Sequence, residues 1–153
     1  MDMKKFTSLK WKNVNLPDSL LGGLTRAFEL NLYSAFLQHE PNSVEILVEI
    51  GNLYTRLGQV KEGLQVDERL VKINPKEPLF HYNLACSQSL LGQVDSALDS
   101  LQRAIGLGYH NLEYMVQDED LENARKDRRF QDLIRQAREA KKPPKKRPQQ
   151  EVQ

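Results

Sequence analysis

The sequence predicts an all-α fold of stacked helix pairs, and three observations support that class. The stretch 78–111 repeats the pattern of the stretch 44–77 at a period of 34 residues, and a fixed period of this length is typical of stacked repeat proteins. The tripeptide Gly-Gln-Val occurs at 58–60 and again at 92–94, between the two expected helices of each copy. Small residues also recur at matched positions, where the two helices of a pair must cross closely. These positions are Gly51 with Ala85 and Gly63 with Ala97.

Composition and charge are those of one ordinary globular domain. The chain has 153 residues, of which 39% are hydrophobic and 28% charged, enough to bury a core without a disulfide or metal. Its 22 basic and 21 acidic residues give a formal net charge of +1, which argues against a nucleic-acid-binding field over the whole domain. A single cysteine, Cys86, excludes an intramolecular disulfide and fits a reducing compartment. Neither a signal peptide nor an apolar run long enough to span a membrane is recognised, so a cytoplasmic protein is expected.

The N-terminal part is expected to hold an arm and one half of a repeat. Residues 1–15 show no sustained period and are either a partly ordered arm or a segment that packs on the first helix. Residues 16–43 form the half repeat, with a helix that starts near Asp18 and is weakened or broken at Gly22-Gly23. Its apolar residues recur at spacings of three and four and are expected to be buried. These are Leu24, Phe28, Leu32, Ala35 and Phe36.

Two full repeats follow, at 44–77 and 78–111. Gly58 and Gly92 lie between the helices of each pair, where glycine can adopt the left-handed conformation that ends a helix. Because each pair leaves one apolar face uncovered, neighbouring pairs must stack. The pattern positions are Leu47, Ile50, Gly51, Tyr54, Gly63, Asp67, Leu70 and Pro75 in the first copy, and His81, Leu84, Ala85, Gln88, Ala97, Leu101, Ala104 and Tyr109 in the second.

This pattern resembles that of the tetratricopeptide repeat family, with departures at Asp67, Leu70, Gln88 and Tyr109. The resemblance covers roughly residues 24 to 111. It implies a right-handed superhelix of antiparallel helix pairs, in which the first helix of each pair lines a concave groove.

The C-terminal third is predicted to cap the stack with helices at 112–140. Residues 112–116 lie where the first helix of a third repeat would fall, and the repeat pattern ends after them. The segment Asp127-Arg128-Arg129-Phe130 is similar to the closing segment of many bacterial tetratricopeptide proteins. One apolar side should pack on the last full repeat. It comprises Leu121, Ala124, Phe130, Leu133, Ile134 and Ala137. Residues 141–153 form a basic tail that is expected to be disordered.

No residue pattern indicates an enzyme, a metal site or a cofactor. The run Asp118-x-Asp120-x-Glu122 lacks the glycine and the final glutamate of a calcium loop, so capping and a solvated acidic face are the expected roles. The three histidines share no ligand spacing with Cys86. His81 is expected to be a packed, hydrogen-bonded core residue, and Cys86 a small filler without a basic neighbour in sequence to lower its pKa.

The predicted function is a non-catalytic module or adaptor that binds a peptide or helix of a partner protein in the groove. The segment bound is expected to be neutral to basic, with Tyr82 as an apolar anchor and Glu45 and Glu49 fixing its register; alternatively, these glutamates only face water. A groove for chaperone C-terminal carboxylates is not expected, because glutamates occupy the positions where cations are needed. The candidate groove residues are Glu45, Val48, Glu49, Asn52, Arg56, Leu79, Tyr82, Asn83, Cys86, Ser89, Glu113, Val116 and Gln117.

Two other functions remain open from sequence. The basic residues at 141–147 could anchor the chain weakly to nucleic acid or to an anionic surface, in a salt-sensitive manner. Alternatively, an incomplete first repeat could leave an apolar end that self-associates as a homodimer or scaffold.

Overall fold

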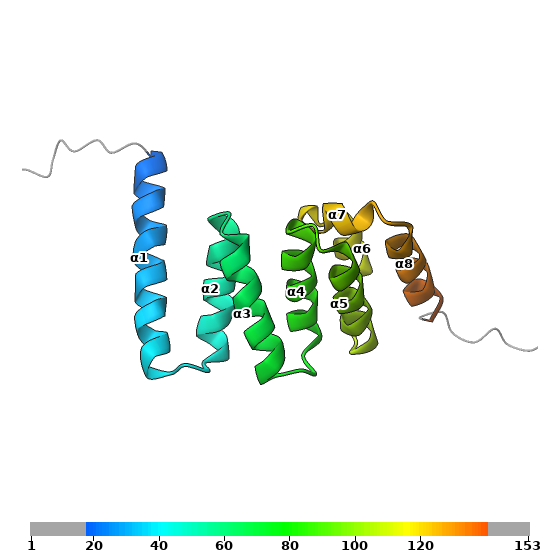
Figure 1. Cartoon of the computed structure of the whole chain (residues 1–153), viewed down its shortest axis with the longest axis horizontal. Coiled ribbons are helices and arrows are strands. Elements are labelled where there is room, and N and C mark those ends of the chain that lie inside the picture. The colour runs from blue at the N-terminus through cyan, green and yellow to red at the C-terminus, as the bar shows by residue number, and fades with distance from the viewer. Residues whose placement is uncertain (1–17, 141–153) are drawn as a thin grey trace, which may run out of the picture.

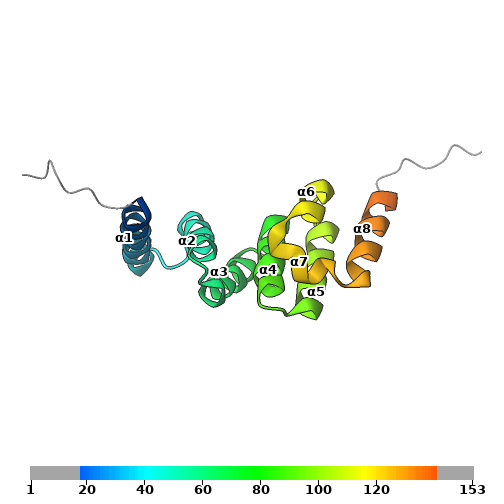
Figure 2. The ribbon, with the colours of Figure 1, turned by 90° about the horizontal axis from the view of Figure 1, so that it is seen from above.

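The computed structural model describes residues 18–140, and all of the regular secondary structure in that range is helical. The helices follow one another along one long axis (Figure 1), and Figure 2 shows α1 at one end of the row and α8 at the other. The elements are α1 (Asp18–His39), α2 (Val44–Arg56), α3 (Val60–Ile73), α4 (Pro78–Leu90), α5 (Val94–Gly106), α6 (Leu112–Gln117), the 3-10 helix η3 (Glu119–Leu121), α7 (Glu122–Arg125) and α8 (Arg128–Ala140).

The predicted all-α solenoid with a helical C-terminal cap is therefore confirmed. The arm at 1–15 and the tail at 141–153 lie outside the described residues, so both remain predictions. Across 18–140, no helix combines the length and the apolar character that crossing a bilayer requires.

Each of the two central helix pairs turns at a glycine. Gly58 has a φ of 71° and Gly92 a φ of 73°, the left-handed region that glycine enters without steric cost. In the first pair the amide of Gln59 donates a hydrogen bond to the carbonyl of Tyr54 at 2.9 Å, and the second pair repeats this contact. The arrangement satisfies carbonyl groups that the end of a helix leaves without partners.

Replacing Gly92 with alanine is expected to lower the free energy of unfolding by about 1 kcal/mol, because a Cβ strains the left-handed conformation. Gly106, the last residue of α5, is the matched control. A Cβ there would meet nothing within 4 Å, and the backbone shows no positive φ. Gly106→Ala should leave stability unchanged or raise it by less than about 1 kcal/mol. Urea denaturation measures both, and an equal loss in the two variants would contradict the interpretation.

The close crossing of paired helices depends on small residues. A Cβ added at Gly51 would lie 3.4 Å from Cγ1 of Val66 on α3, and one added at Gly63 would lie 3.7 Å from Oγ1 of Thr55 on α2, so both positions are in contact with the facing helix. In the second pair Ala85 and Ala97 are both fully buried. Close packing of this kind leaves little space for a larger side chain.

The first helix differs from its prediction in two ways. It runs from Asp18 to His39 without interruption, so a break at Gly22-Gly23 is wrong. The apolar stripe expected to be buried is instead exposed, because α2 packs on another side of α1, where Leu37 joins the apolar cluster around Leu47. The exposed fractions are 55% for Leu24, 67% for Phe28, 42% for Leu32 and 51% for Phe36.

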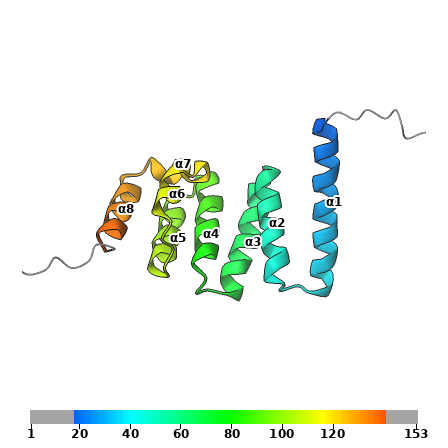
Figure 3. The same ribbon diagram turned by 180° about the vertical axis from the view of Figure 1, so that it is seen from behind.

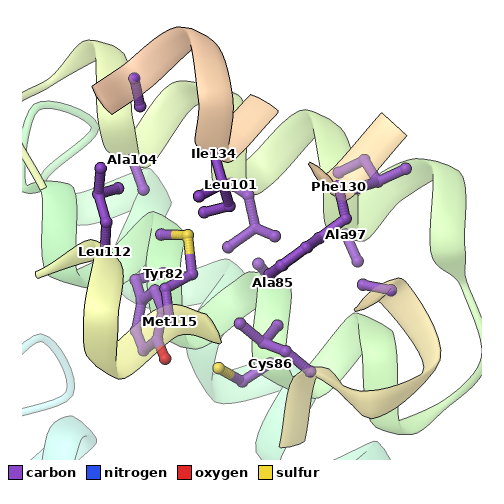
Figure 4. Packing of buried hydrophobic residues seen from close by; sticks show 14 residues of the cluster. Tyr82, Ala85, Cys86, Ala97, Leu101, Ala104, Leu112, Met115, Phe130 and Ile134 are labelled. Atoms are coloured by element: carbon purple, nitrogen blue, oxygen red, sulfur yellow. The ribbon is translucent and has the colours of Figure 1, made fainter. Parts of the chain in front are cut away.

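The C-terminal helices close the other end of the stack as predicted. Figure 4 shows Phe130 and Ile134 of the cap directed into a cluster with Leu101, Ala97 and Ala104 of α5. All six apolar residues named from sequence for this side are buried or partly buried in that cluster. The cap is therefore a part of the apolar core.

Asp127, the residue before α8, stabilises the start of this helix. Asp127 accepts hydrogen bonds from the amide and the guanidinium of Arg129, at 2.9 Å and 2.7 Å. These bonds lower the pKa of the Asp127 carboxyl to about 2. The same guanidinium reaches Asp95 of α5 at 2.6 Å, which links the cap to the last full repeat.

Candidate functional site: an acidic pocket between α2, α4 and η3

A pocket of about 400 Å³ lies between the first helices of the two repeats and the segment that follows α6. This volume falls within the range of ligand pockets in proteins. Helices α2 and α4 supply most of the lining, at the place where the repeat pattern predicts a groove. The lining residues are Val48, Gly51, Asn52, Thr55, Arg56, Asp67, Tyr82, Asn83, Cys86, Ser87, Leu90, Tyr114, Asp118 and Asp120.

Negative charge predominates in this pocket. Among the described residues that line it, Asp67, Asp118 and Asp120 supply three carboxyl groups and Arg56 supplies one cationic group. Burial, followed by the charges of Asp118 and Glu119, raises the pKa of the Asp120 carboxyl. Carboxylates that repel one another in a partly desolvated site favour a cation beside them. The site is therefore suited to a positively charged group.

Asp67 is a buried carboxyl that joins the two repeats. It lies on α3 with 6% of its surface exposed, and its Oδ2 accepts a hydrogen bond from the hydroxyl of Ser87 on α4 at 2.6 Å. Burial raises the pKa of Asp67 to about 6, against the lowering effect of that hydrogen bond. The repeat pattern normally has an apolar residue here, so this departure contributes both a link between repeats and a pocket carboxyl.

Tyr82 forms the wall of the pocket toward the cap. Its ring stacks on Tyr109 with a centroid distance of 4.3 Å and an interplanar angle of 6°, and its hydroxyl donates a hydrogen bond to the carboxylate of Asp118. Only 4% of the residue is exposed. Figure 4 shows the ring beside Met115 and below Leu112. Tyr82 therefore holds the wall together, and little of its surface is free to contact a partner.

Cys86 has the environment of an inert thiol. The residue is 9% exposed and belongs to the apolar cluster of the cap, with its Sγ 3.8 Å from Oδ2 of Asp118. Burial, then the charges of Asp118 and Asp120, raises the pKa of the thiol far above its usual range. A protonated thiol is a poor nucleophile and a poor metal ligand. Within residues 18–140, no group of three or more potential metal ligands is assembled.

His81 lies in the core, as predicted. It is 2% exposed, and its Nε2 lies 2.9 Å from the carbonyl oxygen of Pro75. The ring thus connects the start of α4 to the loop before it.

The pocket brings together six of the thirteen groove residues named from sequence. The six are Val48, Asn52, Arg56, Tyr82, Asn83 and Cys86. The other seven do not line it: Glu45, Glu49, Leu79, Ser89, Glu113, Val116 and Gln117.

Four of these seven have other side-chain contacts. Glu45 accepts a hydrogen bond from the hydroxyl of Ser43 at 3.2 Å. Ser89 is fully buried beneath α7, where its hydroxyl accepts a hydrogen bond from the amide of Ala124 at 3.3 Å. Glu113 pairs with Arg138 of α8 at 2.8 Å. Val116 packs against the apolar cluster of the cap.

Sequence reasoning missed the acidic side of the pocket. Asp118 does cap η3, since its Oδ1 accepts a hydrogen bond from the amide of Asp120 at 3.0 Å. Both residues are nevertheless only partly exposed, and they face α4 rather than forming the solvated acidic face that was expected. The one available signal was Asp67, an acidic residue at an apolar position of the repeat.

The fold and the pocket together define a tetratricopeptide-like α-solenoid. Two crystal structures of MamA, a TPR-like all-α solenoid, resemble this chain, with TM-scores of 0.59 and 0.62 and sequence identities of 23% and 21%. The similarity covers 72% and 80% of this chain, and 63% and 65% of the MamA chains. At this level of identity the likeness establishes the fold alone.

A curated relative shares part of the sequence. A chloroplastic protein of Arabidopsis thaliana is 34% identical over 89 residues, which is 56% of this chain and 27% of that protein. The chain thus spans about a quarter of the length of this relative. No protein-family model matches the sequence.

Proposed function

We propose that this chain is a non-catalytic interaction module that holds a basic segment of a partner protein in the acidic pocket between α2, α4 and η3. The observation that carries the proposal is a concave site lined by three carboxyl groups and one guanidinium. Within residues 18–140 these three carboxyl groups form no ion pair, and a lysine or arginine side chain of a partner would supply one.

The arrangement of the pocket supports a preformed site. Tyr82 and the amide of Asp120 fix the carboxylate of Asp118 from two sides, so little ordering is needed when a ligand enters. Asn52 and Asn83 add amide groups, which can bond to the backbone of an extended segment. A solenoid that presents such a surface along its first helices is suited to partner binding.

The sharpest test is a charge reversal at Asp120. Peptides selected from a random phage-displayed library on the intact protein are expected to be rich in lysine and arginine. Asp120→Lys should weaken their binding at least about tenfold, a change of about 1.4 kcal/mol, because it replaces attraction by repulsion inside the pocket. Fluorescence anisotropy with the selected peptides measures the dissociation constants.

Glu119→Lys provides the matched control. Glu119 is the adjacent residue in the same 3-10 helix, but it is exposed and does not line the pocket. This variant changes the net charge equally and should retain most of the binding. Selected peptides without an excess of basic residues, or equal losses in the two variants, would rule out the acidic pocket as the binding site.

A further inference from the structure

The largest exposed apolar feature among the described residues is a stripe on α1. Leu24, Phe28, Leu32 and Phe36 succeed one another at intervals of four residues, with exposed fractions of 55%, 67%, 42% and 51%. Side chains at this spacing lie on one side of a helix. Single exposed leucines are common on protein surfaces, but a continuous stripe of this kind marks an interaction surface.

Nothing in the described chain covers this stripe. Helix α1 has 22 residues and α2 has 13. Figure 1 and Figure 3 show α1 at the end of the row, extending beyond α2 on its N-terminal side. The contacts with α2 are made on another side of α1, through Leu37.

The stripe is also free of charge. From Gly22 to Gln38 the charged residues are Arg26 and Glu29. At 100° per residue Arg26 points away from the stripe, whereas Glu29 lies at its edge, about 80° from the centre line. The centre of the stripe is uncharged and can meet an identical surface, with the Glu29 carboxylates of the two copies at the rim of the contact.

The order of residues within the stripe is complementary to itself. If two copies of α1 pack antiparallel about a two-fold axis at position 30, Leu24 lies opposite Phe36 and Phe28 lies opposite Leu32. Every phenylalanine then faces a leucine of the other copy, so large and smaller side chains interdigitate. Antiparallel packing also places opposite ends of the helix dipoles together.

We propose that this chain forms a homodimer through its α1 stripe, with the two copies of α1 antiparallel. The four side chains expose on the order of 400 Å² in each copy, so together they supply about 800 Å² of buried interface area. Stable interfaces bury about 1,200 Å² or more, and the residues that flank the stripe supply the remaining area. The dimer joins two solenoids end to end and leaves both acidic pockets open, because no residue of α1 lines the pocket.

The first test compares Leu32→Glu with Leu107→Glu in the full chain by sedimentation equilibrium. Leu32 is 42% exposed in the stripe and Leu107 is 39% exposed at the C-terminal end of α5, so the chemical change and the exposure are matched. The wild-type chain and Leu107→Glu should sediment as dimers. Leu32→Glu should raise the dissociation constant by about a hundredfold, because each dimer loses the contact twice.

The second test determines the direction of packing with single cysteines and a short bismaleimide cross-linker. Asn31 lies next to the two-fold axis and at the edge of the stripe. The cysteines of Asn31→Cys in the two copies are therefore within reach of the cross-linker, and a covalent dimer is expected. In this packing Gln38 of one copy lies opposite Gly22 of the other, so the two Gln38 positions are about 24 Å apart along the helix axes. Gln38→Cys should therefore not cross-link. The wild-type chain reports the background from the buried Cys86.

Three results would overturn the proposal. The first is a monomer at every concentration, as expected if residues 1–17 or another protein covers the stripe. The second is equal behaviour of Leu32→Glu and Leu107→Glu. The third is cross-linking of Gln38→Cys, which would indicate parallel helices. Circular dichroism checks that the variants are folded, and the exposure of Leu32 in the single chain means that its replacement removes few internal contacts.

Discussion

Replacing Phe130 with alanine is expected to lower the free energy of unfolding by about 3–5 kcal/mol, because the change leaves a cavity in the centre of a packed cluster. Phe130 is fully buried and anchors α8 against α5, beside Leu101 and Ile134. Loss of this side chain removes the main apolar contact of the cap, so helical content should fall together with stability. Urea denaturation followed by circular dichroism measures both quantities.

Two further variants make this result specific. Phe130→Leu preserves most of the volume and should cost only about 1 kcal/mol. Leu107→Ala shortens an exposed side chain and should change stability by less than about 0.5 kcal/mol. All variants are compared at one protein concentration. If Phe130→Ala were as mild as Leu107→Ala, α8 would not be part of the cooperative core.

The second large effect concerns the pH dependence of stability at Asp67. Burial raises the pKa of this carboxyl from its ordinary value of 3.8 to about 6 in the folded chain. Between these two values the folded state binds the proton more tightly than the unfolded state does. The free energy of unfolding therefore falls as pH rises through this interval, by up to about 3 kcal/mol, and the loss is complete by about pH 7.

Asp67→Asn removes this titration while keeping an oxygen that can accept the hydrogen bond of Ser87. Relative to the wild-type chain, the variant should gain stability progressively as pH rises from about 4 to about 7. Glu68→Gln, at the exposed neighbouring position, should show the same decrease in the free energy of unfolding with rising pH as the wild-type chain. Urea denaturation at intervals of pH gives the two difference curves. A constant difference between Asp67→Asn and the wild-type chain would show that burial does not perturb this carboxyl.

The sequence by itself determined the helix pairs and how they end. Its period of 34 residues identified two matched hairpins, and glycine at 58 and 92 fixed the turns, because only glycine takes a positive φ there without strain. The apolar spacing also identified the buried side of α8, including Phe130 and Ile134. The turns and the apolar spacing are local features, since they depend on residues a few positions apart in the chain.

The tertiary structure alone decided which of these surfaces are covered and which side chains share a pocket. Periodicity showed that Leu24, Phe28 and Phe36 share one face of a helix, but α2 packs on a different side, so that face is exposed. After Gln117 the repeat register ends, and the packing of the cap on α4 carries Asp118 to the hydroxyl of Tyr82, 36 positions away in sequence. Contacts between residues so far apart depend on how whole helices pack, which no local pattern specifies.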